Sequence, residues 1–234
     1  MKHQMKQFDR NFGIMTESLW EEICQTKVML VGLGGLGGHI ANSLARFGIR
    51  SLILVDFDCF ELSNINRQLF STHSTLGQSK TAVFLDELPK INPNIALIAY
   101  PSRIQDIDVS VFDTVDIVID AVDDISTKLF LETIVSMHHK VLLHGAVGGW
   151  FGQIGILTEE AHLLSELYGK SAFGDEKSLL NPAFAPAIVA NMMVSEFVKY
   201  RMGNAEALVN KIMMLDLLHH DYRVVLQKNV VERK

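Results

Sequence analysis

The chain is poor in cysteine. Only Cys24 and Cys59 occur among its 234 residues, and no C-x-x-C pair is present. Two cysteines cannot build a disulfide framework, and the closely spaced pairs of a four-cysteine zinc site are missing. We therefore expect a protein of a reducing compartment that holds no zinc.

Long apolar runs and an excess of basic residues are also missing. No run reaches the about 18 apolar residues that a membrane span needs, and the opening MKHQMKQFDRNFG lacks the apolar stretch of a secretion signal. The net charge of −6 at pH 7 disfavours a partner recognised through a nucleic acid backbone. We expect a cytoplasmic protein that binds neither membranes nor nucleic acid.

Apolar residues are plentiful, and their pattern predicts an α/β fold. Hydrophobic residues make up 48% of the chain, and its length suits one domain, 1–234. Strand-like and helix-like runs alternate through a predicted nucleotide-binding core at about 27–145, which indicates a doubly wound, Rossmann-like and mostly parallel sheet. Strands are expected at 27–32, 51–56, 95–100, 115–121, 140–145 and 150–158, and helices at 36–47, 79–88 (ending near Pro89) and 127–139.

The pattern changes after residue 145. Residues 159–182 are polar and contain glycine, and we interpret them as a long crossing segment. The region at about 183–227 predicts an apolar helix closed by Gly203 and a final hairpin of 211–218 with 222–227. The hairpin would extend the sheet with antiparallel strands.

A glycine turn follows the first predicted strand. Gly32, Gly34 and Gly37 satisfy G-x-G-x-x-G at the start of a helix, where free N–H groups and the helix dipole favour phosphate. Asp56 ends the second predicted strand, where a carboxylate can accept hydrogen bonds from ribose hydroxyls. This combination predicts a nucleotide site but fits NAD as well as ATP.

The loop after Asp56 favours ATP. A site that cleaves between the α- and β-phosphates needs fixed cations aimed at the phosphates, with arginine as a fork and lysine as a point charge. Arg67 and Lys80 form such a pair. Arg67 shares its loop with the polar residues Asp58, Asn64, Asn66 and Gln68, and Lys80 follows soon after the loop.

These motifs together resemble the ThiF/MoeB/HesA family, bacterial relatives of the ubiquitin-activating enzymes. The matching stretches, which span roughly residues 8 to 227, are GLGGLG (32–37), LVDFDCFELSNINRQ (54–68), LGQSK (76–80), INPNI (91–95), DIVIDAVDD (116–124) and GAVGGWFGQI (145–154), and DRNFG (9–13) is similar to the family's opening arginine motif. The resemblance implies an adenylyltransferase that uses ATP and Mg²⁺. It would convert the C-terminal Gly-Gly carboxylate of a ubiquitin-like sulfur carrier into an acyl-adenylate and release pyrophosphate.

The resemblance also implies roles for single residues. Asp56 would hold the ribose and Asp123 the Mg²⁺ ion, and Arg10 would reach the γ-phosphate from the partner subunit of a homodimer. Gly34 and Gly35 would flank the phosphates, and the triphosphate would be held by Asn66, Arg67, Gln68 and Lys80. Asp120 and Asp123 are spaced so that one carboxylate could face Mg²⁺ and the other the backbone.

The sequence departs from the family pattern at three places. The two zinc-binding cysteine pairs of many members are missing, and the crossing segment holds no cysteine for a thioester step. We therefore expect the enzyme to stop at the acyl-adenylate and to leave it to an outside sulfur donor, with Cys59 as the only cysteine near the site. Asp124 stands where the family usually has asparagine, which could weaken nucleotide binding or strengthen metal binding.

Other functions stay open at this point. A branch of the family activates a threonylcarbamoyl group on tRNA, which the net charge disfavours. A binding protein that has lost its chemistry is disfavoured by the intact Arg67, Lys80 and Asp123. An NAD-dependent oxidoreductase is disfavoured by the loop that carries Arg67 and by Lys80. The identity of the carrier, its pathway and the sulfur donor are not encoded in any motif.

Overall fold

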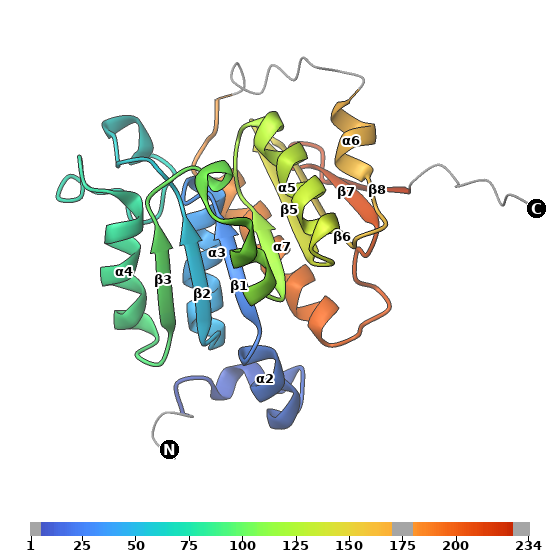
Figure 1. Ribbon diagram of the computed structural model, residues 1–234, viewed down its shortest axis with the longest axis horizontal. Coiled ribbons are helices and arrows are strands. Elements are labelled where there is room, and N and C mark those ends of the chain that lie inside the picture. Colours follow the sequence, from blue (N-terminus) through green and yellow to red (C-terminus); the bar gives the residue numbers. More distant parts are fainter. Residues whose placement is uncertain (1–5, 170–179, 227–234) are drawn as a thin grey trace, which may run out of the picture.

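One mixed sheet of eight strands forms the centre of the computed structural model, which describes residues 6–169 and 180–226 (Figure 1). The strand order is β3-β2-β1-β4-β5-β6-β7-β8; β1 to β5 run parallel and the last three continue the sheet antiparallel. The strands are β1 Lys27–Val31, β2 Ser51–Val55, β3 Ala96–Tyr100, β4 Ile117–Asp120, β5 Val141–Gly148, β6 Phe151–Leu157, β7 Lys211–Asp216 and β8 Asp221–Leu226. The predicted doubly wound parallel sheet with an antiparallel C-terminal extension is confirmed.

Helices cover both faces of this sheet. α3, α4 and α7 bury their apolar sides on one face, and α5 and α6 on the other. The helices are α2 Glu17–Cys24, α3 Gly35–Phe47, α4 Lys80–Ile91, α5 Ile125–Met137, α6 Leu163–Tyr168 and α7 Phe184–Arg201, and the 3₁₀ turns are η1 Asp9–Gly13, η2 Leu62–Asn64, η3 Ile104–Asp106 and η4 Val109–Thr114. Within the described residues, no helix is both long and apolar enough to cross a membrane.

The two faces explain why the parallel strands are continuous apolar runs. In β1, Val28 and Leu30 belong to the core under α3 and α7, whereas Met29 and Val31 belong to the core under α5. Alternate residues of a strand point to opposite faces, so a strand covered on both sides needs apolar residues at every position.

Two expected boundaries differ from the structure. α4 continues past Pro89 to Ile91, so the proline stands inside the helix and does not end it. The crossing segment begins with a short helix, α6, whose first turn is tied to the buried Glu132 of α5. Its residues 170–179 lie outside the described part of the chain.

Candidate active site

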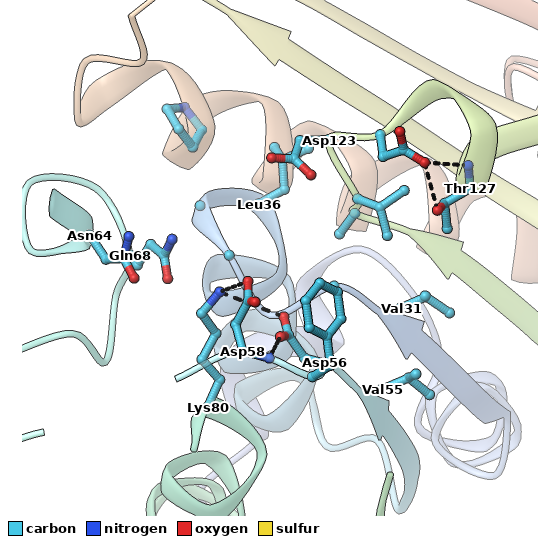
Figure 2. Close-up of a pocket in the computed structure, with 18 of the residues that line it drawn as sticks. Val31, Leu36, Val55, Asp56, Asp58, Asn64, Gln68, Lys80, Asp123 and Thr127 are labelled. Atoms are coloured by element: carbon cyan, nitrogen blue, oxygen red, sulfur yellow. Dashed lines mark hydrogen bonds and ion pairs between the residues drawn. The ribbon is translucent and has the colours of Figure 1, made fainter. Parts of the chain in front are cut away.

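A pocket of about 520 Å³ lies at the carboxyl ends of the parallel strands (Figure 2). Its volume falls within the range of small-molecule sites. Loops after β1, β2, β3 and β4 line it, together with the start of α7. Doubly wound sheets bind ligands at this edge, where neighbouring connections leave to opposite faces.

The glycine turn forms one end of the pocket. Gly34 is the N-cap of α3 and has no side chain to satisfy the first N–H groups of the helix, which remain available to an anion. Gly32 has φ +90°, and a side chain there would collide with the main chain of Ala121. Gly37 does not line the pocket; a Cβ at this position would lie 1.9 Å from the Gly32 carbonyl oxygen. Gly37 therefore serves the close packing of helix on strand.

Asp56 is fixed where β2 ends. Its Oδ2 accepts a hydrogen bond from the Leu33 N–H at 2.6 Å, and its Oδ1 accepts one from the Asp58 N–H at 2.8 Å. Burial raises the pKa of Asp56 above its ordinary value, and the Lys80 ammonium together with the two N–H donors opposes that rise. Each carboxylate oxygen keeps a second lone pair that can accept from a ribose hydroxyl.

Lys80 is the first residue of α4 and points back at the two aspartates. Its Nζ lies 2.9 Å from Asp58 Oδ2 and 3.9 Å from Asp56 Oδ2 (Figure 2). The lysine is buried, whereas the Asp58 side chain is about half exposed, at 48%. An ammonium held in this way faces the pocket and has two carboxylates to balance it.

Three of the four polar residues in the predicted N-x-N-R-Q motif line the pocket: Asn64, Arg67 and Gln68. The buried Oε1 of Gln68 has no hydrogen-bond partner in the described part of the chain, so it offers an acceptor to a ligand. Asn66 does not line the pocket. It accepts from Arg67 Nη1 at 2.9 Å and donates to the Asn181 carbonyl at 3.0 Å, so its side chain orients Arg67 instead.

The three carboxylates at the end of β4 and in the loop after it have different surroundings. Asp123 lines the pocket, and its side chain has no hydrogen-bond or ion-pair partner among residues 6–169 and 180–226. Asp120 does not line the pocket; it is fully buried and accepts from the Val122 N–H at 3.2 Å and from the side chains of Lys128 and His144. Asp124 caps α5 by accepting from the Thr127 N–H at 2.8 Å.

Arg10 lies at the far end of the molecule. Its neighbour Asn11 donates to the carbonyl of Phe47, the last residue of α3, whereas the pocket lies at the first residues of that helix. Thirteen residues of α-helix span about 20 Å. Figure 1 shows η1 and α2 beyond the amino ends of the parallel strands. Within one chain, Arg10 does not reach the pocket.

The structure adds residues that the sequence pattern had not indicated. The Arg103 guanidinium lies 4.0 Å from the centre of the Phe57 ring, and both residues line the pocket. Gln105 donates to Thr127 Oγ1 at 3.1 Å beside them. Arg103 and Gln105 follow β3, and the rule that ligands bind where parallel strands end could have pointed to this loop.

The two cysteines differ in their surroundings. Cys59 is exposed and lines the pocket. Cys24 is buried, and desolvation raises its pKa to about 12, so it stays a thiol at neutral pH. Only Cys59 is placed where a nucleotide or an adenylate could meet a thiol.

Comparison with known proteins identifies relatives of the whole chain. The family model of the ThiF family matches residues 8–231. The chain is 29% identical to the molybdopterin-synthase adenylyltransferase of Escherichia coli over 87% of this chain and 84% of the relative. It is 25% identical to the sulfur carrier protein adenylyltransferase of Thermus thermophilus over 87% and 79%.

A solved structure shares the fold. The crystal structure of E. coli MccB with ATP superimposes with a TM-score of 0.73, at 20% identity, over 91% of this chain and 67% of that one. The superposition shows the shared fold, and the family model, which matches nearly the whole chain, shows the family. The chain belongs to the ThiF family.

Proposed function

We propose that the protein is an ATP-dependent adenylyltransferase that activates the C-terminal Gly-Gly carboxylate of a ubiquitin-like sulfur carrier. The observation that carries the proposal is the convergence of Arg67, Lys80 and Asp123 on the pocket at the start of α3. The names of its E. coli and T. thermophilus relatives support the reaction class and the kind of carrier.

The proposed reaction is a transfer to the α-phosphate of ATP. A carrier carboxylate oxygen forms a bond to the α-phosphorus, the bond to the β-phosphate oxygen breaks, and pyrophosphate leaves. The carboxylate is already a nucleophile, so the step needs no general base. The protein's work is then alignment and stabilisation of the phosphate charge.

Each pocket residue has a task in this scheme. Asp56 accepts from the ribose hydroxyls, and the N–H groups at the start of α3 face phosphate oxygens. Arg67 donates bidentate hydrogen bonds to phosphate oxygens, and Lys80 adds a compact positive charge. Asn66 holds the Arg67 side chain in place from outside the pocket.

The residues present fit a Mg²⁺ ion. Mg²⁺ takes one or two carboxylates together with phosphate oxygens and water, and Asp123 lines the pocket with a carboxylate that has no partner in the described ranges. Asp123 would hold the ion, which when bound neutralises part of the phosphate charge. Asp124 is engaged at the cap of α5, so its charge faces the helix more than the nucleotide.

Assembly is part of the proposal. The family resemblance implies that Arg10 contacts the γ-phosphate, and Arg10 does not reach the pocket of its own chain. We therefore infer a homodimer in which Arg10 of a second copy reaches the pocket. Apolar side chains are exposed at the start of α7 and at the β5–β6 turn, which supports a surface that a second copy covers. These side chains are Trp150, Phe151, Phe184 and Ile188. An outside sulfur donor would then attack the carrier adenylate.

The deciding experiment is carrier-dependent exchange of labelled pyrophosphate into ATP. Arg67→Ala and Asp123→Ala should each lower the exchange rate by about 10²–10³, the usual cost of one preorganised charge contact. Exchange at the wild-type rate in both variants, or tight NAD binding without ATP binding, would contradict the proposal.

Complementation tests the shared site. Arg10→Ala and Arg67→Ala are expected to be inactive alone, and their mixture should regain about a quarter of wild-type exchange, since half the dimers are mixed and carry one intact site. A monomer in sedimentation, or a mixture that stays inactive after subunit exchange, would remove Arg10 from the site.

A further inference from the structure

A buried ionic cluster lies behind the pocket wall, on the α5 face of the sheet. Asp120, Lys128 and His144 are each fully buried. Lys128 Nζ lies 3.2 Å from both oxygens of Asp120, and His144 Nδ1 lies 2.7 Å from Asp120 Oδ2. Charges without solvent are costly, so a cluster of this kind calls for a specific use.

The hydrogen atoms of the cluster can be assigned from its chemistry. Burial by itself opposes the charged form of Asp120, but the Lys128 ammonium and the hydrogen bond from His144 hold its pKa below the ordinary value. An ionised Asp120 only accepts, so His144 Nδ1 is the donor. Its Nε2 is buried and has no hydrogen-bond partner among the residues that the structure describes. Within these residues, the hydrogen bond to Asp120 is therefore the polar contact that orients the His144 ring.

The cluster connects the two strand ends that form one wall of the pocket. Lys128 also donates to the Gly145 carbonyl at 2.8 Å, directly before Ala146 and Val147, which line the pocket. Asp120 Oδ1 accepts from the Val122 N–H, and Val122 lines the pocket as well. One lysine thus fixes β5 and the loop after β4 relative to each other.

Asp123 depends on its neighbours for its position. Its carboxylate has no polar partner among the described residues, yet it must face a metal ion and phosphates in the proposed reaction. Val122 before it is held by Asp120, and Asp124 after it is held as the cap of α5. The loop is therefore fixed on both sides of the one side chain that stays free for a ligand.

We propose that Asp120, Lys128 and His144 are positioning residues that hold the loop 121–124 so that Asp123 faces the metal and nucleotide. The inference rests on the proposed function and adds to it three residues that do not touch the ligand. An ion pair whose only use was to stabilise the core could be replaced by neutral residues without effect on the loop.

That contrast gives the test. The double variant Asp120→Asn with Lys128→Met removes both charges together and leaves no uncompensated ion in the core. Calorimetry should show that Mg²⁺ strengthens ATP binding about 10–100-fold less in this variant than in the wild type, the usual cost of removing a residue that orients a metal ligand. In nucleotide-free protein, hydrogen exchange at the Val122 and Asp123 amides should become faster.

Glu132→Gln is the matched control. Glu132 is one turn further along α5, equally buried, and accepts from the N–H groups of Leu164 and Ser165 in α6. Its loss should loosen α6 and leave both the Mg²⁺ dependence and the exchange at Val122 and Asp123 unchanged. Equal effects of the control and the double variant on these readouts would overturn the inference.

A milder variant covers the case in which the double variant does not fold. His144→Leu keeps the ion pair and removes one of the contacts that orient Asp120, so the Mg²⁺ effect should fall in the same direction by less than tenfold. Unchanged Mg²⁺ dependence and unchanged amide exchange in a folded variant would overturn the inference. A wild type that binds no Mg²⁺·ATP would instead refute the proposed function, and amide exchange would still decide whether the cluster holds the loop.

Discussion

Two lysine–aspartate clusters lie at the same edge of the sheet and differ in their access to solvent. Lys80 begins α4 and meets Asp58 and Asp56 at the end of β2. Lys128 lies in the first turns of α5 and meets Asp120 at the end of β4. The Asp58 side chain is 48% exposed, whereas the side chains of Lys128 and Asp120 are both 0% exposed.

This difference in solvent access suits the two lysine–aspartate pairs to different roles. Lys80 lines the pocket, and its exposed partner Asp58 can be hydrated when a phosphate takes over the lysine. Lys128 cannot exchange partners without leaving a buried charge unpaired, so it fixes the main chain instead. In the proposed scheme, the partly exposed pair therefore binds the ligand and the buried pair positions the loop, although both pairs consist of a lysine and an aspartate.

The largest expected effect is on stability, at the buried pair. Lys128→Met alone leaves Asp120 as an uncompensated buried carboxylate and should lower the free energy of unfolding by about 3–5 kcal/mol. Urea unfolding measures it, and the double variant with Asp120→Asn should recover most of the loss. A loss below about 1 kcal/mol in the single variant would mean that the two clusters do not differ in this way.

The second-largest expected effect is on activity, at the partly exposed pair of Lys80 and Asp58. Lys80→Met should lower carrier-dependent pyrophosphate exchange by about 10²–10³, while its loss of stability stays below that of Lys128→Met. Lys90→Met is the control on the same helix, since Lys90 pairs with Asp86 and Glu87 at the surface. Exchange that falls equally in both variants would remove the special role of Lys80.

Thiol modification measures how accessible the pocket around Lys80 and Asp58 is to reagents, and it needs no substitution. Iodoacetamide at pH 8 should modify Cys59, which lines the pocket beside Asp58, and ATP should protect it. Cys24 should stay unmodified in the folded protein, because it is buried and its pKa is raised to about 12. Mass spectrometry of the digested protein distinguishes the two sites, and modification of Cys59 that ATP leaves unchanged would place the nucleotide elsewhere.

Local sequence patterns pointed to Asp56 and Lys80 in the partly exposed cluster but not to Lys128 and His144 in the buried cluster. The glycine turn, Asp56, Arg67 and Lys80 could be identified because each follows a strand or begins a helix in a known spacing. Lys128 and His144 are ordinary residues of a helix and a strand, and only the pairing of β4 with β5 brings Asp120 beside His144.

The orientation of single side chains was equally beyond the sequence. Asn66 belongs to the predicted motif, yet it turns to Asn181, more than a hundred positions further along the chain. Gly37 fits the nucleotide fingerprint and serves helix packing. α4 continues to Ile91 although Pro89 can donate no helical hydrogen bond, so the expectation that the helix ends near the proline placed its end too early.

The smallest expected effect concerns Asp124, the cap of the helix that carries Lys128. Asn and Asp are equally good caps, so Asp124→Asn should remove only the attraction of a negative charge to the helix start, about 0.3–1 kcal/mol at neutral pH.

The pH dependence of that difference has a definite sign. Hydrogen bonds from Ser126 and Thr127 hold the pKa of Asp124 below its ordinary value of 3.8, so the charged form contributes its stability above pH 3.8 and loses it as the pH falls through the lower folded-state pKa. Urea unfolding of both proteins from pH 7 down to pH 3 should show the wild-type advantage shrinking at the acid end. A variant that matches the wild type at every pH, yet binds Mg²⁺·ATP differently, would show that Asp124 faces the ligand and not the helix.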